Sequence, residues 1–350
     1  MIIFIMITFS PAIRLFPLYT SKVAKQAAWL SPIVAFIGML ILVIIFQSFF
    51  KKGTDLNFSD VISNILGKVL GRIVITLFLA YELILSAMHV RYYAERMLAS
   101  IMPEVSIHFL LVVMLSFVFY VARGDIETLA RFIELLFFAF VIAFGIISIL
   151  ALSNVKITNI LPVSYLDILP ITKGSTGIFI VWGYYFLLVF FFADHVNGRV
   201  QIKRFGIQAS IFVLIVAILV IILTVGTMGQ SLTSRVPLPY FVVVKVISIL
   251  GTLEHLESVV LAIWVSADFI LISVMVYAAV SIIKSLFKLS ETKSFVSPVI
   301  LITYIMSLYL AKNRFELEAF STNIGTPLNI VWCGGFPLLL FVIGKIRKVI

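Results

Sequence analysis

The sequence predicts an all-α polytopic membrane protein with ten transmembrane helices, and three observations lead to this fold class. Of the 350 residues, 62% are hydrophobic and only 12% are charged, and the mean hydropathy is +1.20. A chain with so few polar residues cannot cover a water-soluble surface. The apolar residues also form long continuous stretches, whereas the strands of a membrane barrel would show short runs of alternating polarity.

Charged and Pro-, Gly- or Asn-rich breaks divide the chain into ten apolar stretches. Each is close to the roughly 20 residues that a helix needs to cross the hydrocarbon core. The connections are too short for a folded soluble domain, so we expect one transmembrane domain, residues 1–350. The first stretch lacks a basic leader and a small-residue cleavage site, and we expect it to be retained. The stretches lie near residues 2–18, 28–50, 70–98, 106–122, 132–152, 176–193, 205–228, 257–283, 296–311 and 325–344.

Basic residues in the connections predict the orientation. If the N-terminus is cytoplasmic, fifteen of the 26 Lys and Arg residues lie in inner connections and eight in outer ones. Both termini are therefore expected on the cytoplasmic side of the cell membrane. The net charge of +10 then forms a rim against anionic lipid, and no nucleic-acid surface is expected.

Catalytic and metal-binding motifs are not expected. The single cysteine, Cys333, allows neither an internal disulfide nor a cysteine-rich metal site. Nothing resembles a nucleophile elbow or a phosphate-binding loop. The sequence therefore favours a protein that is not an enzyme and that needs no cofactor or metal.

The first stretch contains the run TFSPAIRLFP, in which Pro11 removes one backbone donor and its ring disrupts the preceding turn. In hydrocarbon, each freed backbone group costs several kcal/mol unless protein, ligand or water satisfies it. One interpretation is a broken helix, with half-helices 2–9 and 13–18 whose ends bind a solute. The other is a proline kink that neighbouring side chains heal.

The sixth stretch contains GIFIVWGYYFLL, in which Gly177 and Gly183 interrupt an apolar helix beside Trp182, Tyr184 and Tyr185. The first and sixth stretches are corresponding positions in two halves of five helices. Paired interruptions at such positions indicate a transporter-type site near the bilayer midplane. Alternatively, Gly183 is a close-packing contact for another helix.

Several motifs resemble the B-subunit family of spore germinant receptors, a branch of the amino acid, polyamine and organocation transporter superfamily. The resemblance covers nearly the whole chain. Its most specific part is the eighth stretch, with an acidic pair before the helix. The motifs are SPAIRLFP, QAAWLSP, RGDIETLARFIELLFF, ITNILPV and LEHLESVVLAIWVSADFILISVMVYAA.

This resemblance implies a leucine-transporter-like fold with two inverted five-helix repeats, about residues 1–152 and 176–345, and with helices 1 and 6 broken at a central pocket. It also implies a nutrient germinant, commonly an amino acid, and a spore inner membrane location. The implied partners are an A subunit and a lipoprotein C subunit. The chain departs from the family at Ser10-Pro11-Ala12, where relatives tend to have Gly-x-Gly, and Gly183 is offset by a residue or two.

Three ionisable residues at depth in the bilayer are functional candidates, because charge there is expensive. Arg14 lies just outward of the proposed break, and Glu82 and Asp268 lie near mid-bilayer. Arg14 either pairs with one of the acids or receives a ligand carboxylate, or else it snorkels outward past Tyr19. The candidate ligand-binding residues are Thr8, Phe9, Ser10, Pro11, Ala12, Arg14, Glu82, Ser86, Trp182, Gly183, Tyr184 and Asp268.

The third stretch carries a polar stripe, because steps of four, three, four and three place five polar residues on one helical face. This stripe either lines a watery approach to the pocket or contacts a partner subunit. Nearby, Arg91 and Glu95 are expected to form a surface pair. The residues of the stripe are Glu82, Ser86, His89, Tyr93 and Arg96.

Glu254, His255 and Glu257 precede or open the eighth stretch. They either gate entry to the pocket, contact other subunits, or simply form the acidic N-terminus of a helix.

Two function classes share the predicted fold. The first is a nutrient sensor, whose ligand shifts a conformational equilibrium that a partner subunit detects. The second is a permease that moves an amino acid with a proton or sodium ion. The resemblance favours the sensor. Because the family's glycines are missing, a third interpretation stays open, a structural subunit that has lost its ligand pocket.

Overall fold

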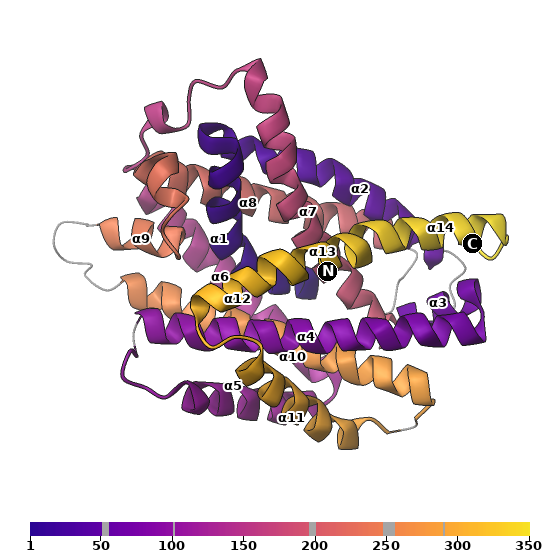
Figure 1. Cartoon of the computed structure of the whole chain (residues 1–350). Coiled ribbons are helices and arrows are strands. Elements are labelled where there is room, and N and C mark those ends of the chain that lie inside the picture. Colours follow the sequence, from indigo (N-terminus) through magenta and orange to yellow (C-terminus); the bar gives the residue numbers. More distant parts are fainter. Residues whose placement is uncertain (51–55, 101, 196–200, 248–255, 290) are drawn as a thin grey trace. The chain divides into compact units, whose positions relative to one another are not determined.

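The computed structural model describes residues 1–50, 56–100, 102–195, 201–247, 256–289 and 291–350, and all regular secondary structure within these ranges is helical (Figure 1). Seven helices in the described part are long and apolar enough to cross a membrane. The first of these, Ile2–Phe49, contains two of the predicted stretches, and the helices Ile107–Ala122 and Lys293–Tyr309 are shorter and apolar. The chain is therefore a polytopic helical membrane protein, and the count of ten spans stays a prediction.

The chain forms two compact units, and each combines segments from both halves of the sequence. The predicted pair of inverted repeats stays a prediction, because the units are not continuous halves of the chain. The first unit comprises Met1–Ile44, Phe132–Gly183 and Lys203–Ala267, and the second comprises Ile45–Arg131, Tyr184–Ile202 and Asp268–Ile350.

The first unit is built around an apolar cluster that includes the rings of Phe9, Phe144 and Tyr240. Phe9 meets Phe144 edge to face, with ring centroids 5.4 Å apart. Helix α9 also packs against α1 in this unit. Its elements, whole or in part, are α1 (Ile2–Ala24), η1 (Lys25–Leu30), α2 (Ser31–Phe49), α6 (Ile126–Leu152), η2 (Ile157–Asn159), η3 (Tyr165–Asp167), α7 (Ile168–Val189), α8 (Ile202–Thr233), α9 (Pro239–Val246) and α10 (Leu256–Phe287).

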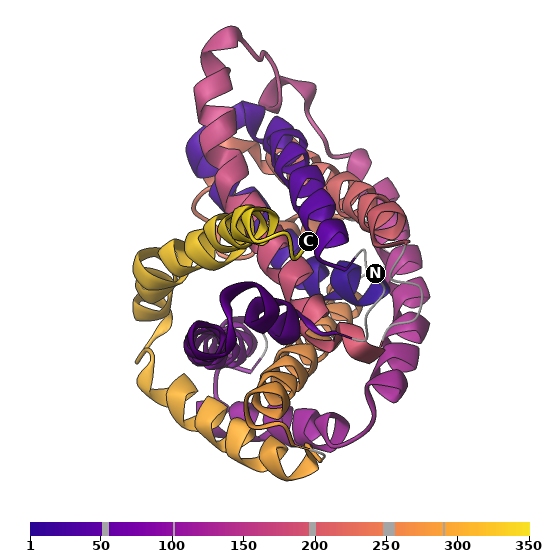
Figure 2. The same cartoon turned by 90° about the vertical axis from the view of Figure 1, so that its right-hand side faces the viewer.

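The second unit is organised along α4, which is 33 residues long and appears nearly end-on in Figure 2. Helices α3, α5 and α11 pack against α4, and α5 and α11 also contact each other. Besides the ends of α2, α6, α7 and α10, its elements are α3 (Phe58–Leu66), α4 (Lys68–Ser100), α5 (Ile107–Ala122), η4 (Phe190–His195), α11 (Lys293–Tyr309), α12 (Arg314–Phe320), η6 (Ser321–Gly325), α13 (Thr326–Asn329), η7 (Ile330–Gly335) and α14 (Phe336–Ile346).

The predicted break in the first stretch is wrong, because α1 is one α-helix with Pro11 and Pro17 inside it. A proline in a continuous helix removes one hydrogen bond, whereas unwinding in hydrocarbon would free several backbone groups at several kcal/mol each. Ser10-Pro11-Ala12 also lacks a glycine that would adopt the unusual backbone angles of a break. The kink alternative therefore fits α1 better.

The predicted break at Gly183 is also wrong, because α7 continues through Gly177 and Gly183 to Val189. One glycine inside a helix costs only about 1 kcal/mol. The interruption lies further along, at Phe192, which has non-helical backbone angles of φ −123° and ψ 28°. The Ser281 hydroxyl of α10 donates to the nearby Phe191 carbonyl at 2.7 Å and satisfies a backbone acceptor at this irregular turn.

The last predicted stretch is longer than expected and contains two π-helical turns. Helical structure is continuous from Arg314 to Ile346, and the turns are η6 and η7. A proline lies in the first turn of the α-helical segment that follows each, Pro327 in α13 and Pro337 in α14. Each proline lacks an N–H and cannot donate a backbone hydrogen bond. Because the π-helical turn before it is wider, the helix does not require that bond and stays helical.

Candidate functional site

The polar stripe predicted on the third stretch is a buried face of α4. Glu82 and Ser86 are fully buried, and His89 and Tyr93 are 8% and 6% exposed. The hydrogen-bond partners of Glu82 and His89 lie on α7, and the ion-pair partner of Arg96 lies on α10. The stripe therefore packs inside the second unit, and the shared face is confirmed.

Glu82 contacts a tyrosine rather than a cation. The Tyr184 hydroxyl of α7 donates to Glu82 Oε2 at 2.7 Å. In the part of the chain that the structure describes, neither Glu82 Oε1 nor the Ser86 hydroxyl has a hydrogen-bond partner. This carboxyl group thus keeps one oxygen available inside the protein.

Tyr81 connects α4 to α13 and η7 of the last helical run. Its hydroxyl donates to the Asn329 side chain and lies 4.0 Å from Cys333 Sγ. The ring of Tyr81 meets that of Tyr184 edge to face, with centroids 5.8 Å apart. Sequence reasoning missed these contacts, because nothing in the chain signals which residues of two distant helices will meet.

One turn beyond Ser86, His89 continues the polar face. Its Nε2 lies 3.2 Å from the Tyr185 hydroxyl, and the tautomer of the imidazole decides which group donates. Tyr184 and Tyr185 are adjacent on α7, with ring centroids 5.0 Å apart. Two neighbouring tyrosines therefore contact two titratable side chains of α4.

Arg96 forms an ion pair with Asp268, so the partner of this acid is Arg96, whereas one predicted alternative paired an acid with Arg14. The Arg96 and Asp268 side chains are only 12% and 7% exposed. A buried pair of this kind holds each charge in place, because either charge alone would be costly there.

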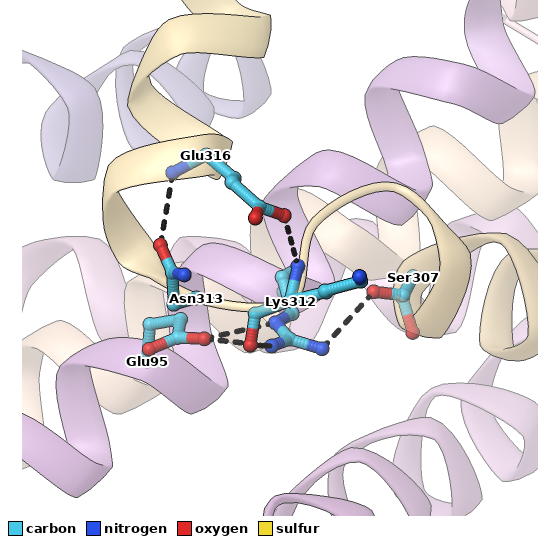
Figure 3. Close-up of polar contacts among 6 residues, drawn as sticks. Glu95, Ser307, Lys312, Asn313 and Glu316 are labelled. Carbon is cyan, nitrogen blue, oxygen red and sulfur yellow. Dashed lines mark hydrogen bonds and ion pairs between the residues drawn. The ribbon is translucent and has the colours of Figure 1, made fainter.

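The expectation that Arg91 and Glu95 form a surface pair is wrong, because Arg91 is 4% exposed. Its guanidinium contacts Glu95 at 2.8 Å and donates to the Lys312 carbonyl at 3.0 Å and the Ser307 carbonyl at 3.5 Å (Figure 3). Glu316 accepts from the Lys312 N–H at 2.8 Å. Arg91 therefore fastens the end of α11 and the connection between α11 and α12 to α4.

The candidate residues of α1 are buried in the first unit. Thr8 donates its hydroxyl to the Phe4 carbonyl of its own helix at 2.6 Å, and Phe9 lies in the apolar cluster. Pro11, Ala12 and Ser10 are likewise buried.

Arg14 is 5% exposed, whereas Tyr19 is 39% exposed. This burial does not fit the alternative in which Arg14 snorkels outward.

Trp182 has an indole that packs against Phe16, with ring centroids 5.9 Å apart. The side chain is fully buried, and its Nε1–H has no hydrogen-bond partner among the described residues. A buried N–H without a partner is costly, so a ligand acceptor would stabilise it.

The twelve predicted ligand-binding residues are divided between the two units. Glu82, Ser86, Tyr184 and Asp268 belong to the second, and the others belong to the first. A joint pocket stays a prediction. Glu254 and His255 lie outside the described residues. The described residues contain no group of three or more His, Cys, Asp or Glu side chains placed to hold a metal ion.

Several apolar spans together with a buried polar helix face define a polytopic membrane protein that carries polar chemistry inside its membrane-spanning part. Residues 1–316 match the family described as spore germination protein, and the chain belongs to this family.

Relatives from two Bacillus species align over almost the full length of this chain. The putative spore germination protein YfkT of Bacillus subtilis (strain 168) is 23% identical over 94% of this chain and 90% of its own length. Spore germination protein KB of the same strain is 23% identical, over 93% and 89%. Spore germination protein GerQB of Bacillus cereus is also 23% identical, again over 93% and 89%.

Proposed function

We propose that this protein is the membrane subunit of a spore germinant receptor, which binds a small nutrient germinant and triggers germination. Its membership of the spore germination protein family carries this proposal. In the proposed receptor it works with an A subunit and a lipoprotein C subunit in the spore inner membrane. Ten spans, with both termini cytoplasmic, fit the distribution of basic residues.

The proposed germinant is an amino acid. Arg14 and the Trp182 N–H are buried groups that suit a carboxylate. Because α1 and α7 continue through Pro11 and Gly183, side chains rather than freed backbone groups would contact the ligand. The leucine-transporter-like arrangement of two inverted repeats remains part of this proposal.

The germination response of spores tests the ligand site. Trp182→Phe keeps a ring against Phe16 but removes the indole N–H. We expect it to raise the germinant concentration for a half-maximal response about tenfold, because a lost hydrogen bond to a charged group is worth about 1.4 kcal/mol or more. Arg14→Gln should raise it at least as much, and Ser10→Leu and Gly183→Leu should abolish the response.

Trp332→Phe is the matched control, because Trp332 lies in the second unit and stacks on Tyr81. Its dose response should equal that of the wild-type protein. Equal dose responses for Trp182→Phe and Trp332→Phe, with both proteins present in the membrane, would refute the ligand role of Trp182.

A permease that couples an amino acid to a proton or sodium ion is the second candidate. The observation that favours it is Glu82, a buried carboxyl group within a membrane-spanning helix. Vesicles that contain only this protein distinguish the two functions. Uptake of a labelled amino acid supports the permease, whereas absence of flux together with dependence on A and C subunits supports the receptor.

A further inference from the structure

We propose that Glu82 is a reversible proton-binding site inside the membrane, and that His89 delivers the proton along the polar face of α4. Such a proton site is independent of the solute that the protein binds. An N–H bond of the protonated His89 imidazole breaks, an O–H bond forms on one carboxyl oxygen of Glu82, and the imidazole regains a proton from water.

Glu82 lacks a compensating charge in the part of the chain that the structure describes. The carboxyl group is fully buried near the middle of α4, and the described residues place no Lys, Arg or His within ion-pair distance of it. A carboxylate in hydrocarbon surroundings is costly unless a cation or several donors stabilise it. The single hydrogen bond from the Tyr184 hydroxyl to Oε2 is insufficient to stabilise a buried carboxylate charge. A proton on the other oxygen neutralises the group.

The groups around Glu82 do not compete for that proton. The titratable side chains that face it are Tyr81 on α4, Tyr184 on α7, and Cys333 in η7. All three are neutral in their ordinary protonated forms. Of these groups, all among the described residues, the carboxyl group has the lowest ordinary pKa, so it is the first to change charge as the pH rises.

A row of polar side chains along α4 offers the proton a route to Glu82. Polar groups follow one another along the face of α4 beyond Glu82, first Ser86 and then His89. The Ser86 hydroxyl has no hydrogen-bond partner in the described part, so it suits a bridging water. His89, which contacts Tyr185, is the natural relay because imidazole accepts and releases protons near neutral pH.

The Arg96–Asp268 pair closes the row toward the C-terminal end of α4. Among the described residues, the two acids at this end, Asp268 and Glu95, each pair with an arginine, so neither traps the proton before it reaches His89.

Infrared spectroscopy of the purified full-length protein in lipid nanodiscs tests the proposal. At neutral pH the wild-type protein should show the carbonyl band of a protonated carboxylic acid, and the band should fade reversibly as the pH rises. Glu82→Gln should lose this band. The control Glu318→Gln should retain it, because the Glu318 side chain is 42% exposed and pairs with Arg314.

Two further variants keep the test independent of folding defects in Glu82→Gln. Tyr184→Phe removes the donor to Oε2 and should shift the frequency of the band. His89→Phe should leave the band in place but slow its shift after transfer to heavy water several-fold. Identical carbonyl regions in wild-type and Glu82→Gln protein would overturn the proton site, and an unchanged exchange rate in His89→Phe would overturn the route.

Discussion

Two buried acids lie along helix α4 in the second unit, Glu82 on α4 itself and Asp268 on α10, and they are held in opposite ways. Asp268 meets Arg96, so two charges neutralise each other. Glu82 meets the Tyr184 hydroxyl, so its charge has no counterpart among the described residues. The same helix face therefore carries one ionic contact that fixes structure and one acid whose protonation state is free to change.

The difference matters because the cost of a buried charge depends on its partner. An ion pair is broken at a high cost when one partner is removed, since the other charge stays buried. When a neutral acid accepts a hydrogen bond from a neutral donor, replacing either partner leaves no buried charge behind. Variants that neutralise each acid in turn therefore separate the two roles, and their expected effects on stability are very different.

The largest effect is expected from Asp268→Asn. This change leaves the buried Arg96 guanidinium without its carboxylate, so we expect the free energy of unfolding to fall by about 3–5 kcal/mol. Chemical denaturation of the purified protein in detergent micelles measures it. The double variant Arg96→Met, Asp268→Leu should recover most of the loss. A double variant as unstable as Asp268→Asn would show that the pair is not the cause.

Arg91→Met should have the next largest effect. The methionine fills similar space but donates no hydrogen bond to the Lys312 and Ser307 carbonyls, and each bond to a charged group is worth about 1.5–3 kcal/mol. We expect faster hydrogen exchange in the connection between α11 and α12. Arg314→Met, on the partly exposed Arg314–Glu318 pair, is the control. Equal exchange in both variants would contradict the fastening role of Arg91.

Glu82→Gln should change the free energy of unfolding by less than about 1 kcal/mol. Glutamine has the shape of the protonated acid and still accepts from Tyr184, so no buried hydrogen bond is lost. The same denaturation experiment measures the change. A loss comparable with that of Asp268→Asn would mean that Glu82 is ionised and paired, which contradicts the comparison.

The smallest effect is expected from Glu318→Gln, which removes a pair that is exposed to solvent. Such pairs contribute about 0–1 kcal/mol. Denaturation should give a value close to that of the wild-type protein. If Glu318→Gln lowered the free energy of unfolding more than Asp268→Asn does, burial would not determine how much each ion pair contributes to stability.

Much of the fold was predictable because hydrophobic length determines where a chain crosses the bilayer. The third stretch, predicted at residues 70–98, is α4 at Lys68–Ser100, and the fourth, predicted at 106–122, is α5 at Ile107–Ala122. The polar stripe was predictable for a similar reason, since helical spacing alone places its residues on one face.

The interruptions of the helices were not predictable from proline and glycine alone. Pro11 lies inside a continuous helix, whereas Phe192 is non-helical without a glycine or proline beside it. Tertiary contacts decide between these outcomes, as when Ser281 satisfies the Phe191 carbonyl. The burial of Arg91 was missed for the same reason, because the connection that it contacts comes from more than two hundred residues further along the chain.

Direct binding of a panel of labelled amino acids to the purified protein tests the central claim, that this member of the spore germination protein family itself binds a small germinant. We predict saturable binding of at least one amino acid to wild-type protein and to Trp332→Phe, with roughly tenfold weaker binding to Trp182→Phe. Absence of binding across the panel, or equal affinity in Trp182→Phe, would contradict the account.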